Sequence, residues 1–195
     1  MSEIRTATLD DVPSVVDTMA TALANEAMLR WSYPEDDFEG RIHRHFSYYD
    51  RELTRRGWVR IIDGGAGAAV WIPHDMREED AAIGAAPPGG EESILGSRAD
   101  RHASFWTWVE EHRPETPHEH LSHIGVAPNK QGTGLGSALM RDGLERADEA
   151  RIPVWLETSK ARNAALYERF GFEVVADEDA PEGGPHIWFM LRPPA

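Results

Sequence analysis

A glycine-rich segment, residues 131–136 (QGTGLG), constrains the fold of this chain more than any other feature of its sequence. A strand-like run, 121–126, precedes it, and a long amphipathic helical pattern, 134–150, follows it. Glycines at alternate positions let the backbone approach a bound group closely and turn its amide N–H groups toward it. The start of the following helix adds the positive end of its dipole. The segment therefore predicts a strand–loop–helix unit that suits a diphosphate.

Two common phosphate-binding loops do not fit this segment. A Walker loop ends in Gly-Lys-Ser/Thr, whereas Gly136 is followed directly by Ser137. A dinucleotide-binding loop has the spacing G-x-G-x-x-G and begins directly after a buried strand. Here the spacing is G-x-G-x-G, and residues 127–130 separate it from the strand-like run. A tight strand-to-helix turn without any ligand is the plain structural alternative.

Apolar periodicity and turn signals divide the chain into strands and helices. The predicted strands are residues 4–7, 58–62, 68–72, 121–126, 153–156, 172–175 and 187–191. The predicted helices are residues 8–24, 38–56, 97–111, 134–150 and 162–170. Residues 73–92 are charged and then rich in Pro and Gly, which predicts a mobile loop or lid. With no linker in the sequence, we expect residues 1–195 to form a single domain.

The composition excludes several classes of protein. Without cysteine, the chain has no disulfide framework, no cysteine nucleophile and no cysteine zinc site. The formal net charge of -14 disfavours nucleic acid as a partner and favours cationic substrates, although acidity that serves solubility alone is an alternative. No apolar run reaches membrane-spanning length and no signal segment is evident, so we expect no membrane association and a cytoplasmic location.

Two blocks of sequence resemble the GNAT superfamily of N-acetyltransferases. Gln131, Gly134 and Gly136 match its motif A pattern, Gln/Arg-x-x-Gly-x-Gly/Ala, and residues 124–128 (IGVAP) resemble the strand end before that motif. The second block resembles motif B and consists of residues 156–159, 162–163 and 167–172. The puromycin N-acetyltransferase-like branch of antibiotic acetyltransferases matches best, with further similarity at residues 5–13, 68–71 and 181–183.

The resemblance implies an α/β (α+β) GNAT fold. Such a fold has a mixed central sheet of about six to seven strands, a splay between the two central strands, and about four to five flanking helices. It also implies acetyl-CoA as co-substrate, no metal, and direct transfer of the acetyl group to a small-molecule amine in a ternary complex. The branch points to an antibiotic such as puromycin or a related aminonucleoside. A protein or peptide N-acetyltransferase and a non-catalytic acyl-CoA-binding module are the alternatives, and the chain is expected to be a monomer or homodimer.

The resemblance assigns the coenzyme A half of the site to three parts of the chain. The splayed strand pairs with the pantetheine arm, the loop amides hold the pyrophosphate, and the helix of motif B faces the thioester. The expected cofactor-binding residues are Ile124, Gly125, Val126, Gln131, Gly132, Thr133, Gly134, Leu135, Gly136, Ser137, Asn163 and Tyr167.

Asn163 and Tyr167 lie four residues apart in a predicted helix and therefore share one face. Tyrosine keeps its proton at pH 7, and the resemblance implies that Tyr167 is the general acid for the departing thiolate. Many family members carry an asparagine three residues earlier, where this chain has Lys160, so the role of Asn163 follows the puromycin-type branch. Core packing of Tyr167 against Phe170 and Phe172 is the alternative.

Strand parity bears on the general base. In a regular strand, one face carries His118, His120, Ser122, Ile124 and Val126, and His123 points the other way. Other family members place a base at the position that matches His120, and the pKa of histidine suits this role. Glu157, at the end of its strand, is the alternative base or substrate anchor, and a structural role stays open for both. A metal site at His118 and His120 is disfavoured because His123 faces away.

Aromatic residues are expected to border the acceptor pocket. By the resemblance, Trp31, Tyr33 and Trp106 lie in segments that border it, and aromatic walls suit a flat or nucleoside-like amine. Plain core packing of these rings is the alternative.

Overall fold

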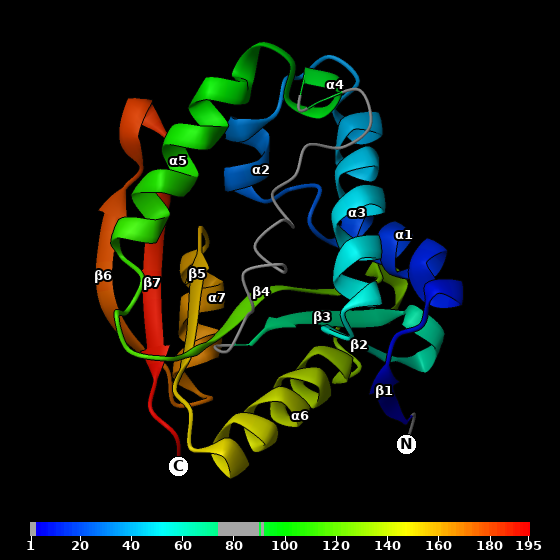
Figure 1. Cartoon of the computed structure of the whole chain (residues 1–195), viewed down its shortest axis with the longest axis vertical. Helices are drawn as coiled ribbons and strands as arrows, with labels where there is room; N and C mark the ends of the chain where they lie inside the picture. Colours follow the sequence, from blue (N-terminus) through cyan, green and yellow to red (C-terminus); the bar gives the residue numbers. More distant parts are fainter. Residues whose placement is uncertain (1–2, 74–89, 91) are drawn as a thin grey trace.

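A computed structural model describes residues 3–73, 90 and 92–195 (Figure 1). Seven strands form one sheet in the order β1-β2-β3-β4-β5-β7-β6. The strands are β1 (Ile4–Thr6), β2 (Val59–Ile62), β3 (Gly67–Ile72), β4 (Glu119–Val126), β5 (Val154–Thr158), β6 (Glu173–Asp179) and β7 (His186–Arg192). Neighbouring strands are antiparallel except β4 and β5, which are parallel. This mixed sheet confirms the predicted fold class.

Helices cover both faces of the sheet. They are α1 (Val12–Ala22), α2 (Ala27–Ser32), α3 (Phe38–Arg55), α4 (Glu92–Leu95), α5 (Ala99–Glu111), α6 (Leu135–Ala150) and α7 (Ala161–Glu168). The predicted long helices are confirmed with shifted ends, whereas α2 and α4 were missed because so few residues show no full helical period. Most of the predicted loop, 74–89 and 91, lies outside the described residues. No helix within the described ranges is long and apolar enough to cross a bilayer.

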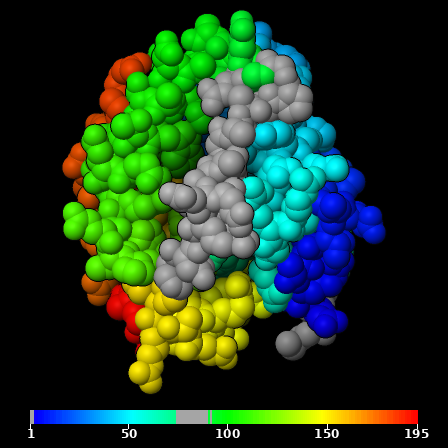
Figure 2. All heavy atoms as spheres, viewed as in Figure 1, coloured from blue at the N-terminus to red at the C-terminus, as the bar shows by residue number. Residues whose placement is uncertain are grey.

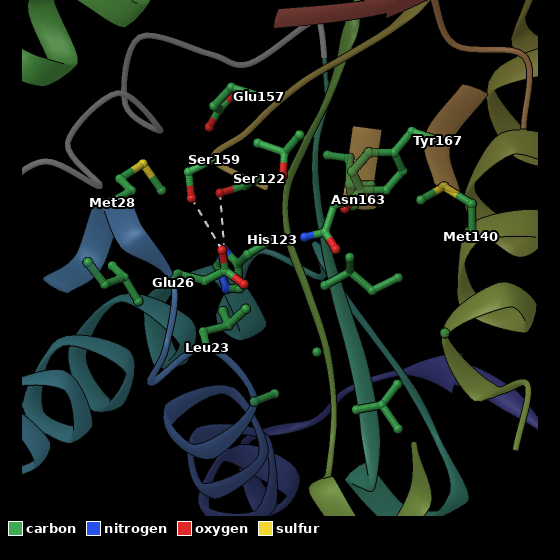
Figure 3. Close-up of a pocket in the computed structure, with 18 of the residues that line it drawn as sticks. Leu23, Glu26, Met28, Ser122, His123, Met140, Glu157, Ser159, Asn163 and Tyr167 are labelled. Carbon is green, nitrogen blue, oxygen red and sulfur yellow. Dashed lines mark hydrogen bonds between the residues drawn. The ribbon is translucent and has the colours of Figure 1, made fainter. Parts of the chain in front are cut away.

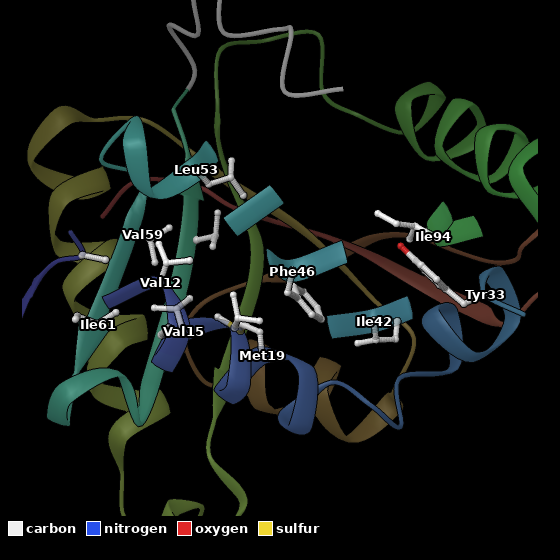
Figure 4. Close-up of a cluster of buried hydrophobic side chains, with 14 of the residues drawn as sticks. Val12, Val15, Met19, Tyr33, Ile42, Phe46, Leu53, Val59, Ile61 and Ile94 are labelled. Atoms are coloured by element: carbon white, nitrogen blue, oxygen red, sulfur yellow. The ribbon is translucent and has the colours of Figure 1, made fainter. Parts of the chain in front are cut away.

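Successive side chains of β3 point to opposite faces of the sheet and pack into two different cores. Ala68 and Val70 pack with α1 and α3 on one face, and Ala69 and Trp71 pack with α6 on the other. Figure 4 shows the first of these cores, where Met19 and its neighbours on α1 meet α3 and the strands. Because both faces of β3 are buried, the strand is a run of apolar residues without polar alternation.

The sheet splays between β4 and β5. Only two positions pair, Glu119 with Val154 and His120 with Trp155, although β4 continues to Val126 and β5 to Thr158. In Figure 1, β3 and β4 run across the view while β5 and β7 run along it. The predicted splay between the central strands is confirmed, and it leaves one edge of β4 open toward its C-terminal end.

A β-bulge in β4 overturns the predicted strand parity. Val70 pairs with His123 but Trp71 pairs with Leu121, so Ser122 is an extra residue that has no partner on β3. His123 consequently turns to the face that His120 occupies, where it contacts Asp50 of α3. The prediction that His123 points away from His120 is therefore wrong, because it assumed an unbroken two-residue period.

A third core lies beneath α5. Phe105 and Val109 of this helix pack against Trp155 of β5 and Phe189 of β7. Figure 2 shows α5 in green and α3 in cyan on opposite sides of one face, with α6 in yellow at its base. The helices α3 and α5 thus stand on either side of the splay.

Candidate active site

A cavity of about 1010 Å³ opens at the splay. Its lining comes from β4, the glycine loop, α6, β5 and α7, and also from the helices α3 and α5. Figure 3 shows Glu26, Ser122, Ser159 and Asn163 facing this common space. The structure thus brings the predicted coenzyme A residues and groups from the opposite face of the sheet into one cavity.

The backbone N–H groups of the glycine loop, at the start of α6, have no hydrogen-bond acceptor within the helix. The first helical hydrogen bond after the loop runs from the Ala138 N–H to the Gly134 carbonyl, so the preceding amides have no helical partner. Gly134 has a φ of 89°, a backbone conformation that favours glycine, and nothing lies within 4 Å of where its Cβ would be. This open space beside free N–H groups fits a diphosphate. Of the predicted loop residues, Thr133 alone does not line the cavity, and its hydroxyl donates to the Lys130 carbonyl at 2.6 Å.

Helix α7 places both predicted side chains beside β4 (Figure 3). Asn163 and Tyr167 line the cavity, and Tyr167 is 9% exposed. Burial raises the pKa of the Tyr167 phenol well above its usual value, and the carboxylates of Glu26 and Glu157 raise it further. The phenol is therefore protonated at neutral pH and can donate a proton but not accept one. Its ring also packs against Phe172, with centroids 5.9 Å apart.

Glu26 is a cavity residue that the sequence patterns did not identify. It lies just before α2 and accepts a hydrogen bond from the Lys160 ammonium at 2.7 Å. The Ser159 hydroxyl is 3.4 Å from its other oxygen. The pair with Lys160 joins residues 134 positions apart, and no local signal could have predicted it. Lys160, which departs from the common family pattern, therefore serves to hold a carboxylate in the cavity.

His120 and Glu157 form a buried pair in the cavity lining. Nε2 of His120 lies 3.0 Å from the Glu157 carboxylate, and their side chains are 7% and 2% exposed. An Arg113 guanidinium nitrogen lies 3.4 Å from Nδ1 of the same ring. Since a guanidinium only donates, Nδ1 accepts and the Nε2–H donates to Glu157. Both ring nitrogens of His120 are thus engaged within the protein, and the ring holds Glu157 in place.

A second histidine–carboxylate pair joins β4 to α3 on one face of the sheet. Nε2 of His123 lies 2.9 Å from a carboxylate oxygen of Asp50, a fully buried residue of α3. The other ring nitrogen of His123 is 3.1 Å from the Ser122 hydroxyl. His123 and Ser122 line the cavity, whereas Asp50 lies behind them. The sequence reasoning missed this chain because the bulge that brings it together was not predicted.

Part of the chain matches a known family of proteins. A family model described as an acetyltransferase (GNAT) domain matches residues 96–174. A solved structure titled histone acetyltransferase HPA2 and related acetyltransferase, from Corynebacterium glutamicum, is 26% identical, covers 100% of this chain and 97% of its own, and superposes with a TM-score of 0.74. Through residues 96–174 the chain is similar to GNAT acetyltransferases.

Two further proteins are similar to this chain. A mycothiol acetyltransferase of Beutenbergia cavernae is 38% identical over 77 residues, which is 38% of this chain. The matched stretch spans about a quarter of that relative, 25% of its length. Arylalkylamine N-acetyltransferase 2 of Aedes aegypti shares the fold, with a TM-score of 0.69 over 98% of both chains at 10% identity. Both are named as acetyltransferases, and the likeness to the second is one of fold.

Aromatic and imidazole rings line the side of the cavity that is formed by α3 and α5. His45 and Tyr49 of α3 are in ring contact, with centroids 4.5 Å apart and planes tilted by 44°, and His102 and Trp106 of α5 stand opposite. The Trp106 indole N–H donates to Nε2 of His102 at 3.0 Å, which leaves the proton of neutral His102 on Nδ1. This chamber is therefore aromatic but carries polar ring atoms.

The predicted acceptor residues are only partly in this chamber. Trp106 lines the cavity, whereas Tyr33 is fully buried behind it and its hydroxyl bonds Nδ1 of His45 at 2.8 Å. Trp31 lies outside the lining and packs on Phe105. The rings of His45 and His102 line the chamber instead. The sequence does not reveal that the two helices carrying them lie opposite each other. No group of three or more metal-ligating side chains occurs among the described residues.

The two chamber histidines make stability sensitive to acid. Burial lowers the pKa of His45 to about 3, with His102 and His123 contributing, and burial lowers the pKa of His102 to about 4, from an ordinary 6.5. As pH falls, these histidines therefore take up protons in the unfolded chain before they do so in the folded chain. Their contribution to stability is complete above pH 6.5 and is lost as pH falls toward the pKa values of the folded state. By about pH 5 each histidine is expected to cost roughly 1–2 kcal/mol of unfolding free energy.

Denaturant unfolding at about pH 7 and about pH 5 measures this loss for the wild type, for His102→Gln and for His43→Gln, whose side chain is 54% exposed. We expect His102→Gln to lose roughly 1 kcal/mol less than the wild type between the two values, and His43→Gln to behave as the wild type. Equal losses in all three proteins would contradict the assignment.

Proposed function

We propose that this chain is an acetyl-CoA-dependent N-acetyltransferase that acetylates a small-molecule amine by direct transfer in a ternary complex. One observation carries the proposal: a single cavity runs from the free amides of the glycine loop, past Tyr167, to a ring-walled chamber on the other side of the splay. Both substrates can meet there without a covalent enzyme intermediate, and the chain has no cysteine to form a thioester.

The coenzyme A half is proposed to use the predicted residues. Loop and helix amides from Gln131 to Ser137 bind the pyrophosphate without a buried counter-charge, and backbone groups of Ile124 and Val126 pair with the pantetheine arm. Asn163 offers an amide to the same arm. Tyr167 donates its proton to the sulfur as the C–S bond breaks, and its raised pKa keeps the phenol protonated at neutral pH until that step.

The acceptor half is proposed to bind a flat amine. The rings of His45, Tyr49, His102 and Trp106 offer stacking surfaces, and the net charge of -14 attracts an ammonium group. Glu157, held by His120, lies on this side as an anionic group that orients the amine. An antibiotic of the puromycin type, with its aminonucleoside, is the first acceptor to test. We also propose that residues 1–195 act as one domain, since strands from both ends of the chain join one sheet. The proposed location is the cytoplasm.

A thiol-release assay tests the proposal. Acetyl-CoA is incubated with the protein and a panel that contains puromycin, phenethylamine, phenylhydrazine, a polyamine and a peptide with a free N-terminus. We expect turnover with at least one small amine and a product mass increased by one acetyl group. Turnover with the peptide alone would support the protein acetyltransferase instead. Coenzyme A binding by calorimetry without turnover on any amine would support a binding module.

A further inference from the structure

Asp50 is a carboxylate buried in the core of the protein next to the cavity. It is 0% exposed, and His123 is the hydrogen-bond partner of one of its oxygens, while the other oxygen has none among the described residues. A buried carboxylate is costly unless a proton donor compensates it. Asp50 therefore keeps a proton on Nε2 of His123, which leaves the lone pair of the neutral ring on Nδ1.

The lone pair on Nδ1 points to a hydroxyl that lines the cavity. Ser122 Oγ lies 3.1 Å from Nδ1, and both residues line the cavity. Adjacent residues of a regular strand would point to opposite faces, so this contact exists because Ser122 is the extra residue of the bulge. The order carboxylate, imidazole, hydroxyl is the arrangement that lets a hydroxyl exchange protons with an oriented base.

His120 has no ring nitrogen that can accept a proton in this way. Its Nε2–H donates to Glu157 and its Nδ1 faces the Arg113 guanidinium, so neither nitrogen has a lone pair free for a substrate. Of the two histidines of β4 in the cavity, His123 has a basic nitrogen that reaches the substrate through one hydroxyl. The two pairs therefore differ in function although they look alike in composition.

We propose that Ser122, His123 and Asp50 form the proton relay that deprotonates the acceptor amine, which rests on the N-acetyltransferase function proposed above. Before attack, the bound ammonium group gives one proton to Ser122 Oγ while the hydroxyl proton of Ser122 moves to Nδ1 of His123, which frees the nitrogen lone pair to attack the thioester carbon. The resulting imidazolium is paired with Asp50. On the other side Tyr167 protonates the leaving sulfur as the C–S bond breaks. The proton that the nitrogen loses after attack passes through solvent to the Tyr167 phenolate, and His123 then releases its own proton to solvent. Asp50 acts by positioning His123 and fixing its tautomer.

Several titratable groups face His123 and set the pH at which the relay works. Asp50 and His45 face it from α3, and Glu26, from the segment before α2, lines the same cavity. His120, with Glu157, lies on the same strand face. Substitution of His123 is therefore expected to change the pH profile of the reaction as well as its rate.

The test compares two amines that need a base to different degrees. Phenethylamine is a strong base whose proton must be removed, whereas phenylhydrazine is a weak base that is already unprotonated at neutral pH. For phenethylamine, His123→Gln is expected to lower kcat/KM by about 10²-fold and to remove the acidic limb of the pH profile. For phenylhydrazine the loss is expected to be less than about 5-fold. Asp50→Asn should behave like His123→Gln because it disturbs the tautomer.

Ser122 gives a test that does not depend on core packing. Ser122→Ala should lower the rate with phenethylamine, and Ser122→Thr, which keeps the hydroxyl, should restore most of it. His43→Gln, an exposed histidine of the same helix as Asp50, is the matched control and should leave activity unchanged. Calorimetry with coenzyme A and thermal unfolding verify that each variant is folded.

The outcomes separate the two proposals. If the wild type acetylates no amine, the N-acetyltransferase function fails and the relay with it. If the wild type is active but His123→Gln and Ser122→Ala keep the wild-type rate and pH profile with phenethylamine, the relay is overturned and the function stands. Equal losses with both amines would also overturn the relay, since they would indicate a structural role.

Discussion

Tyr167→Phe is expected to lower kcat by on the order of 10²- to 10³-fold while the affinity for acetyl-CoA stays close to that of the wild type. The substitution removes only the phenolic oxygen, and the ring keeps its packing against Phe172. The lost group is a donor whose pKa burial has raised, so no neighbouring residue replaces it at neutral pH. Without it the thiolate must leave unprotonated. Steady-state and single-turnover assays measure the loss, and calorimetry measures cofactor binding.

The matched control is Tyr48→Phe. Tyr48 lies on α3 with its ring against Tyr49 and does not line the cavity, so the same loss of one oxygen should leave kcat unchanged. A Tyr167→Phe variant within about 3-fold of the wild type in single turnover would show that no proton from this phenol is needed. Weakened coenzyme A binding with an unchanged chemical step would instead assign Tyr167 to cofactor binding.

Gly143→Ala is expected to destabilise the protein by about 2–3 kcal/mol. Gly143 lies in the middle of α6, where a Cβ would overlap the indole ring of Trp71 on β3. Trp71 is 3% exposed and packs in the core between the sheet and α6, so its ring has nowhere to move. Relief of the clash requires α6 to shift away from the strand, which opens the core. The midpoint of denaturant unfolding measures the loss.

The same substitution at Gly40 should change the stability of the protein in the opposite direction. Gly40 lies in α3, and its added Cβ would meet the carboxylate of Asp37, a side chain that is 61% exposed and able to move. Alanine is the better helix former, so Gly40→Ala should stabilise the protein by about 0.5–1 kcal/mol. If both substitutions stabilised the protein, the close approach of α6 to Trp71 would be wrong.

Local patterns predicted the glycine loop and the α7 side chains that line one part of the cavity. The periodicity of α6 and α7 and the glycines before α6 are properties of short stretches, so the loop and the shared face of Asn163 and Tyr167 follow from neighbouring residues. The assignment of β4 and β5 as strands has the same origin. The splay between them followed from the family resemblance, and the pairing of the two strands confirms it.

The acceptor half could not be predicted in this way. His123 was placed on the wrong face because one bulged residue, Ser122, reverses the parity of the strand. That bulge depends on how β4 pairs with β3, which the residues of β4 alone do not encode. Trp31 and Tyr33 look like pocket residues by their chemistry, yet packing places them outside the lining.

The sequence by itself predicted the fold class, the family resemblance and the glycine loop with its helix, because these depend on spacing within a few turns of chain. Only the tertiary structure decided which polar groups meet in the cavity. Asp50 and His123 are 73 positions apart, His120 and Glu157 are 37, and Glu26 and Lys160 are 134. Each pair is joined by the packing of helices and strands on a shared sheet, and its geometry exists only once that packing is complete.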